Sequence, residues 1–425
     1  MDTLGFAAIA TGIVLFALFA KRLENTVITP PLAFAAFGLI IGDSGLGWAD
    51  LKFENGFIHG LAELTLILVL FSDAARIDLS VLRKDHNLPL RMLLIGMPLT
   101  IVLGTAVALM LPLGLSFWEA ALLGAILAPT DAALGQSVVS SRFVPARIRQ
   151  TLNIESGLND GIALPFVLLF AFLAGAAHAG SEQSWLLFGA KQLILGPLAG
   201  VVIGGAGAWL IDMASKKEWT TESYEGAAIL GLAFLAYSGS ELIGGNGFIA
   251  AFVSGLVFGN AVRGRCGFIF GFAEAEGNFL VLVTFLIFGA AILPTAIGQI
   301  DWAVLLYAVL SLTVIRMIPV TISLIGSGVQ GATVAFLGWF GPRGLASILF
   351  ALFVLEEVPI PAGARIAIIT VVTVTLSIVL HGLSAAPMSR RYGERVSRVG
   401  GAEEMKAVGE MPMRVRSKPR ARETG

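Results

Sequence analysis

The sequence predicts an all-α polytopic membrane protein with about thirteen transmembrane helices. Composition is the first reason: the 425 residues are 56% hydrophobic and 13% charged, whereas about a quarter of the residues of a soluble protein are charged. Length is the second, because a bilayer core about 30 Å thick needs roughly 20 apolar residues per helix, and apolar tracts of that length recur along the chain. The net charge of −1, with basic residues dispersed over the connections, argues against a nucleic-acid partner.

The predicted spans divide the chain into a membrane domain, residues 1–386, and a basic tail, residues 387–425. The first span is expected in the mature protein, because Asp2 precedes it and no cleavage motif follows it. The tail is charged and nearly free of large apolar groups, which predicts a short mobile segment. In chain order, the predicted spans lie near residues 4–20, 28–42, 57–75, 91–111, 117–139, 151–174, 188–211, 225–243, 246–262, 277–294, 302–325, 333–355 and 364–386.

Basic residues alternate along the connections between these spans. Every second connection carries Lys or Arg, and the intervening ones carry mainly Asp and Glu. Cytoplasmic loops are the ones enriched in Lys and Arg, so the alternation predicts an odd number of spans in the cell inner (plasma) membrane, with the amino terminus outside and the carboxyl terminus in the cytoplasm. The basic groups are Lys21 and Arg22; Arg76, Arg83, Lys84 and Arg91; Arg142, Arg147 and Arg149; Lys216 and Lys217; Arg263 and Arg265; and Arg390 and Arg391.

Two of the spans contain a proline beside a charge, which predicts a broken helix. In the fifth span, Pro129 lacks a backbone donor and is followed by Thr130 and Asp131. In the twelfth span, the sequence GPRG places Pro342 before Arg343. The two breaks fall at the same place in two six-span halves, and the single span between the halves leaves them oppositely oriented.

Inverted repeats with one discontinuous helix each are typical of secondary transporters, whose substrate site lies near the bilayer midplane. Backbone groups released at such breaks are tolerated in the membrane only where they are buried in protein or line a cavity. Where the two broken helices cross, we expect Asp131 to face the partially positive helix amino termini and Arg343 to face the partially negative carboxyl termini.

The sequence ESGLND, residues 155–160, places polar groups within the first turns of the sixth span. Helical spacing puts Ser156 and Asp160 on one face, with Glu155 and Asn159 paired on the neighbouring face. Asp160, with Ser156 one turn before it and Asn159 beside it, offers hard oxygen ligands for an alkali cation, and Thr130 could add a hydroxyl or a released carbonyl. The sequence therefore predicts a cation- and proton-binding site at these four residues, with Na⁺ held by Asp160, Ser156 and Thr130.

The two acids of this stretch have different expected roles. An ionised group in a membrane span is costly unless it is paired or hydrated, and Arg343 is the expected partner that neutralises Glu155. Asp160 then remains as one charge that either one Na⁺ or one proton can neutralise. Competition of the two for one site, on a carrier that reorients only when neutral, yields exchange.

Five motifs in order resemble those of the cation/proton antiporter-1 family, specifically its prokaryotic Na⁺/H⁺ antiporters of the NhaP type. The similarity covers the chain except the tail. It implies a homodimer in which a core domain, about 91–174 and 302–386, moves against a dimerisation or scaffold domain, about 4–75 and 188–294. The motifs are PTD at 129–131, ESGLND at 155–160, GFIAAFVSGLVFG at 247–259, GPRG at 341–344 and HGLSAAPMSRRY at 381–392.

The resemblance also implies roles for single residues. Asn159 before Asp160 matches the electroneutral branch, and Asp131 matches a residue of the crossing region. Arg316 falls where a family arginine supports the core, through Asp131, and Asp73 matches a segment that lines the cytoplasmic funnel. Positions matching Asp160, Ser156 and Thr130 contact the ion in the family, and those matching Glu155 and Arg343 form a pair.

The leading hypothesis is electroneutral Na⁺ or Li⁺ exchange for H⁺, without a cofactor, with membrane lipid as the surroundings. A K⁺/H⁺ antiporter is the near alternative, because carboxylate, hydroxyl and carbonyl ligands do not encode ion size. An ion channel would need a continuous pore with a filter. An enzyme is not expected, because neither a metal cluster nor a nucleophile–base pair stands out. His381, at a helix end, fits a structural role better than that of a pH sensor.

Overall fold

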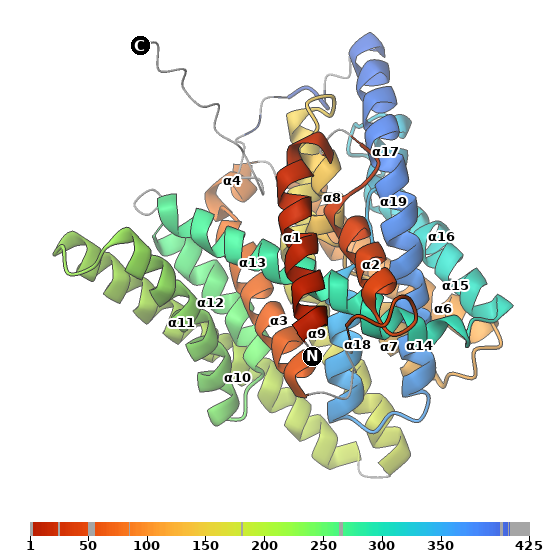
Figure 1. Cartoon of the computed structure of the whole chain (residues 1–425), viewed down its shortest axis with the longest axis horizontal. Helices are drawn as coiled ribbons and strands as arrows, with labels where there is room; N and C mark the ends of the chain where they lie inside the picture. The colour runs from red at the N-terminus through yellow and green to blue at the C-terminus, as the bar shows by residue number, and fades with distance from the viewer. Residues whose placement is uncertain are drawn as a thin grey trace.

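The computed structural model describes residues 3–23, 26–49, 56–84, 86–179, 182–262, 267–399, 403–406 and 408. Within these ranges every regular element is a helix (Figure 1). Seven helical segments there are long and apolar enough to cross a membrane, as judged by length and composition. Each span predicted from the sequence overlaps one of the helices or a broken pair of them.

One group of helices packs around α12 (Gly247–Ala261), which lies against α3 and α10. Gly259 of α12 faces the α3 backbone so closely that a Cβ there would overlap the Ala75 carbonyl. Small residues permit such close helix packing in membranes. The group comprises α1 (Thr3–Leu23), α2 (Pro30–Ile41), α3 (Gly56–Arg76), α10 (Glu182–Lys216), α11 (Glu222–Leu242), α12 and α13 (Gly267–Ile287).

A second group surrounds α9 (Ala146–Ala179), the helix that carries the ESGLND sequence. α7 and α8 pack on α9, and α19 packs on α8, α15 and α18. Its other members are α5 (Asn87–Arg91) continuing through a π-helical turn (Met92–Gly96) into α6 (Met97–Met110), α7 (Phe117–Ile126), α8 (Ala132–Val139), α15 (Trp302–Leu312), α16 (Val314–Ser323), α17 (Gly331–Trp339), α18 (Leu345–Glu357) and α19 (Gly363–Val399). Short elements α4 (Leu79–Lys84), a second π-helical turn (Phe288–Ile292) and α14 (Leu293–Ile297) complete the chain.

Both predicted helix breaks are confirmed. α7 ends at Ile126 and α8 begins at Ala132, while α17 ends at Trp339 and α18 begins at Leu345. The two interruptions touch, because the backbone N–H of Asp131 donates to the carbonyl of Pro342 over 2.8 Å. A backbone donor released at the first break is therefore satisfied by a backbone acceptor released at the second.

The expectation of a mobile tail from residue 387 is wrong for its first part. α19 continues through Pro387 to Val399, and Glu404 beyond it is 1% exposed. Glu404 is buried because its carboxylate caps the start of a distant helix. The composition of the tail cannot indicate such a contact. Residues 409–425 lie outside the described part of the chain.

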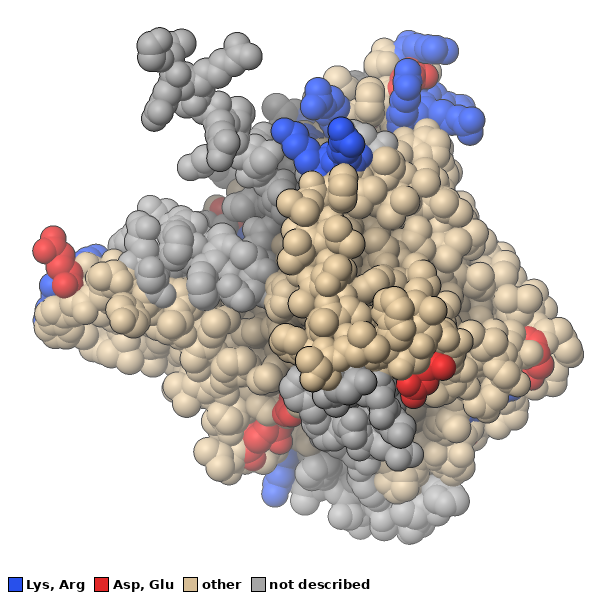
Figure 2. All heavy atoms as spheres, viewed as in Figure 1, with Lys and Arg blue, Asp and Glu red and all other residues tan. Residues whose placement is uncertain are grey.

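Charge is unevenly spread over the surface. Figure 2 shows Lys and Arg gathered mainly along one edge, over the ends of α1 and α19, above a broad band without charged atoms. Lys21 and Arg22 lie in the last turn of α1, and Arg398 in the last turn of α19. An uncharged band of this kind is what a bilayer core requires of the surface that faces it.

Candidate functional site at the helix crossing

Asp131 binds the amino termini of two half-helices, α8 and α18. One carboxylate oxygen accepts the backbone N–H groups of Ala133, at 2.6 Å, and Leu134, at 3.1 Å, and so caps α8. The other accepts the N–H of Leu345, the first residue of α18, at 2.7 Å. Gly344 makes this approach possible, because a Cβ there would overlap the Asp131 carboxylate. The predicted role of Asp131 at a pair of positive helix ends is confirmed.

Arg343 lies at the partially negative helix end of the crossing. Its side chain is 0% exposed, and its Nη1 donates to the carbonyls of Ala128, at 2.8 Å, and Pro129, at 3.4 Å. These carbonyls follow the carboxyl terminus of α7, so the guanidinium compensates a partially negative helix end, as predicted. Its backbone N–H donates to Ser377 Oγ over 2.7 Å.

Glu155 does not pair with Arg343, which corrects the sequence prediction. Its Oε1 lies 2.6 Å from Nη2 of Arg316, and the two side chains are 3% and 2% exposed. The contact is an ion pair by distance, although its alignment falls short of a hydrogen bond. Arg316 was expected to act through Asp131, but Asp131 is committed to the helix amino termini. Arg343 is likewise engaged at α7, so Arg316 is the cation left for Glu155.

Thr130, in the first break, is held by two side chains of α9. Its hydroxyl lies 3.1 Å from Ser156 Oγ and accepts from Asn159 Nδ2 over 2.6 Å, and the same amide approaches the Thr130 carbonyl at 3.1 Å. The amide orientation is assigned from these acceptors. Asn159 and Ser156 therefore both reach Thr130 from α9. All four polar residues of this cluster, Asp160 included, are buried.

One oxygen in this cluster has unused capacity. Asn159 Oδ1 is buried and accepts no hydrogen bond from the described residues. The Ser156 hydroxyl and the Asn159 amide lie beside the broken backbone at Thr130, and Asp160 stands one turn after Ser156 on the same face of α9. Hard oxygen donors of this kind suit alkali cations.

The formal charge of the crossing follows from its named members. Asp131, Glu155 and Asp160 contribute −3 when ionised, and Arg316 and Arg343 contribute +2, so the sum is −1. The helix ends at the two breaks add partial charges of both signs that offset one another. One monovalent cation or one proton would therefore neutralise this group of side chains.

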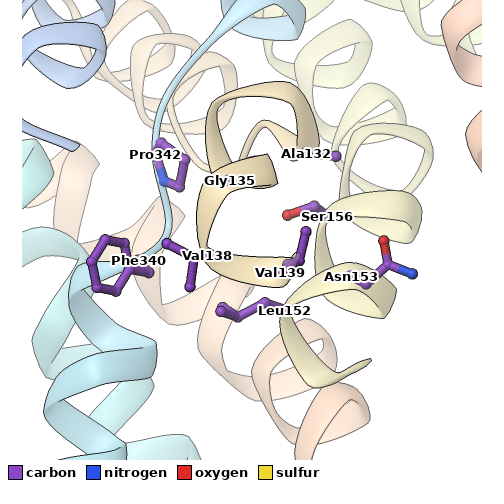
Figure 3. A pocket seen from close by; sticks show the side chains of 9 residues that line it. All are labelled: Ala132, Gly135, Val138, Val139, Leu152, Asn153, Ser156, Phe340 and Pro342. Atoms are coloured by element: carbon purple, nitrogen blue, oxygen red, sulfur yellow. The ribbon is translucent and has the colours of Figure 1, made fainter. Parts of the chain in front are cut away.

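A cavity opens beside the cluster, between α8, α9 and the second break (Figure 3). In Figure 3, Asn153 and Ser156 extend from α9, Val138 and Val139 from α8, and Pro342 from the broken segment. Asn153 stands one turn before Ser156, so an amide and a hydroxyl follow one another along the cavity wall. Asn153 was not among the predicted site residues, although its spacing of three residues from Ser156 was a usable signal.

Two further polar residues hold the second break from α19. His381 is 1% exposed, and its Nε2 lies 2.9 Å from the carbonyl of Trp339, the last residue of α17. The other ring nitrogen, Nδ1, lies 3.0 Å from the Ser377 carbonyl and 3.2 Å from Ser377 Oγ, and this hydroxyl oxygen accepts from the N–H of Arg343. The structural role expected of His381 thus has a definite form: it connects the two sides of the break.

Asp73 lies apart from the crossing, near the end of α3. It is 7% exposed and its Oδ1 is 3.7 Å from Nη1 of Arg76, one turn later. The Asp73 carboxylate is therefore largely buried and lies beside a basic side chain, and its predicted place in a funnel stays a prediction.

The fold and this crossing define a class: a multi-pass membrane protein with buried charges between two broken helices. The chain belongs to the sodium/hydrogen exchanger transmembrane family, which matches residues 7–391. The resemblance drawn from the motifs is therefore confirmed, and the family is one of monovalent cation/proton antiporters.

Individual relatives differ in the cation that they are named for. The chain is 27% identical to the K(+)/H(+) antiporter NhaP of Alkalimonas amylolytica over 411 residues, which cover 95% of this chain and 70% of that protein. It is 28% identical to Na(+)/H(+) antiporter 2 of Zygosaccharomyces rouxii over 420 residues, 88% of this chain and 50% of that protein. The chain therefore spans half to about two thirds of the length of these relatives.

The fold is similar to that of the sodium proton antiporter MjNhaP1 from Methanocaldococcus jannaschii at pH 8. The TM-score is 0.74 with 23% identity, over 92% of this chain and 98% of that chain. At this identity the similarity concerns the fold.

Proposed function

We propose that this protein exchanges one monovalent cation for one proton across the membrane by alternating access, without net charge movement. The formal charge of −1 at the crossing is the observation that carries the proposal. Burial disfavours an uncompensated charge, so the carrier reorients when either a cation or a proton has neutralised it. One-for-one exchange follows from that count.

The ligands proposed for the cation are Asp160, Ser156, Thr130 and the Asn159 amide oxygen. Asp160 supplies the charge that the proton and the cation share. The contacts of Thr130 with Ser156 and Asn159 support a preformed oxygen cluster, because they fix the broken segment against α9. Asp131, Arg343, Glu155 and Arg316 support the site by holding the helix ends and each other.

Na⁺, with Li⁺ beside it, is the cation proposed first, and K⁺ is the second candidate. The names of the relatives support both, since one is a K(+)/H(+) and another a Na(+)/H(+) antiporter. An ion channel is the candidate from another class, and the buried, crossed helix ends favour an occluding site over a continuous pore.

The proposed architecture has thirteen spans in the plasma membrane, arranged as two inverted six-helix repeats. The basic edge faces the cytoplasm, which places the amino terminus outside and the carboxyl terminus inside. The proposal includes a homodimer in lipid, in which the group of helices around α9 moves against the group around α12. The matched breaks and the alternation of basic loops support this arrangement.

Proton flux in proteoliposomes tests the function. Purified protein is reconstituted with an internal pH dye, and Na⁺, Li⁺ or K⁺ is added outside. We expect cation-dependent alkalinisation or acidification according to the gradient, and its loss in Asp160→Ala. Thr375→Ala is the control, because the Thr375 hydroxyl donates to a carbonyl of its own helix, away from the crossing. Absence of cation-dependent flux, or full flux in Asp160→Ala, would refute the proposal.

A further inference from the structure

Glu404, after the last helix, caps the start of α17. Its Oε1 accepts the backbone N–H of Gln330 over 2.7 Å and the hydroxyl of Thr333 over 2.8 Å. Gln330 is the N-cap residue of α17, and its own side chain makes no capping hydrogen bond. A helix amino terminus leaves N–H groups unsatisfied and favours negative charge. Glu404, 74 residues after Gln330, provides both the hydrogen-bond acceptor and the negative charge.

The other broken helix shows what this contact replaces. At the start of α7, Glu119 accepts the N–H of the N-cap residue Ser116 over 2.8 Å, in a capping box within one segment. In α17 the equivalent third helical position is Thr333, which is not an acid. Both broken helices thus begin with a buried carboxylate on the N-cap N–H, but α17 receives its carboxylate from the carboxyl-terminal segment.

The neighbouring residue, Glu403, ties the same segment to α9. Nη1 of Arg147 donates to the Glu403 carbonyl over 2.7 Å and to its Oε2 over 2.8 Å. Arg147 lies in the first turn of α9 and is 6% exposed. Contacts with Lys406 and Arg147 hold the pKa of the Glu403 carboxyl below its usual range, so it stays ionised near neutral pH.

The segment therefore connects the starts of two helices that both lead to the cavity of Figure 3. α9 runs from Arg147 to Asn153 and Ser156 on one wall, and α17 runs from Gln330 to the broken segment on another. We propose that residues 403–406 form a clasp, Glu404 on α17 and Glu403 on α9, that holds these helix ends together and restricts access to the cavity. The residues act by positioning, and the inference goes beyond the proposed exchange.

Cysteine accessibility tests the clasp without measuring transport. The one cysteine of the chain, Cys266, is replaced by serine, and Asn153→Cys is introduced in the cavity wall. The rate of labelling by a small charged methanethiosulfonate reagent is then compared in the full chain with and without Glu404→Ala. We expect the variant to raise the labelling rate about fivefold, because losing one helix cap shifts the equilibrium between closed and open forms of the cavity by about that factor. Glu404→Gln should fall between.

The matched control is Glu394→Gln, which removes a carboxylate from an exposed ion pair with Arg390 on the same helix. It should leave the labelling rate unchanged. A chain ending at Val399 lacks the clasp altogether and should label at least as fast as Glu404→Ala. Equal rates in the unmodified background, Glu404→Ala and the shortened chain, with all three eluting as folded protein, would overturn the clasp. Should Glu404→Ala not fold, the rate in Arg147→Gln, which removes the Arg147 contacts with Glu403 and leaves Glu404 in place, decides in the same way.

Discussion

The contact between α3 and α12 and the crossing of the broken helices are built by opposite means. α12 approaches the α3 backbone through Gly259, and no charge takes part in that close contact. The crossing places Asp131, Arg343 and the Glu155–Arg316 pair in the interior, where each charge meets a helix end or another charge. The first contact should not tolerate an added atom, and the second should not tolerate a lost charge.

The largest effect is expected from the crossing. Arg316→Met leaves the Glu155 carboxylate buried without its partner, and breaking a buried pair in this way costs about 3–5 kcal/mol. The free energy of unfolding in detergent, or recovery of folded protein, measures it. The double variant with Glu155→Gln should recover more than half of the loss. If the double variant is as unstable as the two single losses combined, the two residues do not act as a pair.

The next effect belongs to the close helix contact. Gly259→Ala adds a Cβ that overlaps the Ala75 carbonyl, so α3 and α12 must separate, at a cost of about 1–3 kcal/mol. Gly231→Ala in α11 is the matched control, since nothing lies within 4 Å of its added Cβ. The thermal midpoint should fall for the first variant only. Similar midpoints for both would mean that the close contact is not what fixes this helix pair.

A smaller effect is expected where α19 holds the second break. Ser377→Ala removes the link between His381 and the Arg343 N–H, and a lost hydrogen bond costs about 1 kcal/mol. The Arg343 guanidinium binds the backbone carbonyls of the first break, next to Thr130. Displacing it should therefore raise the apparent KM for the cation. His381→Gln can still donate to the Trp339 carbonyl and should be milder. An unchanged KM in both variants would mean that this link stabilises the fold without affecting cation binding.

The smallest effect concerns an exposed charge at the edge of the same group of helices. Asp301 accepts the Arg365 side chain and the N–H groups of Val304 and Ala303, which lowers the pKa of its carboxyl. A lowered pKa contributes stability above the ordinary value of about 3.9 that is lost as pH falls through the folded-state pKa. The thermal midpoints of the natural chain and Asp301→Asn should therefore converge in acid. A difference that persists at low pH would show that the charge is not its source.

Local chemistry explains which parts of this site could be predicted. Pro129 and Pro342 break their helices because proline lacks a donor, and a charge beside each break must meet the nearest helix end. Asp131 and Arg343 follow from that alone. The partner of Glu155 does not, because two buried arginines were available and only the position of α7 decides which one remains.

The contacts of the carboxyl-terminal segment could not be predicted from the sequence for a similar reason. Its charge density is typical of a solvated tail, and nothing near Glu404 indicates that Gln330 lacks a cap of its own. Such a contact depends on where a helix 74 residues earlier begins, which is tertiary information. The break positions are local, and the partners of buried charges are not.

The charge count at the crossing is tested most directly by the effect of membrane potential on transport. Cation-driven proton flux is measured in proteoliposomes at zero potential and with a potential of either sign imposed, each in parallel with Asp160→Ala. With a formal charge of −1 neutralised by one cation or one proton, we predict the same rate at every potential and no flux in the variant. A rate that rises with one sign of potential, while still depending on Asp160, would contradict one-for-one exchange at this site.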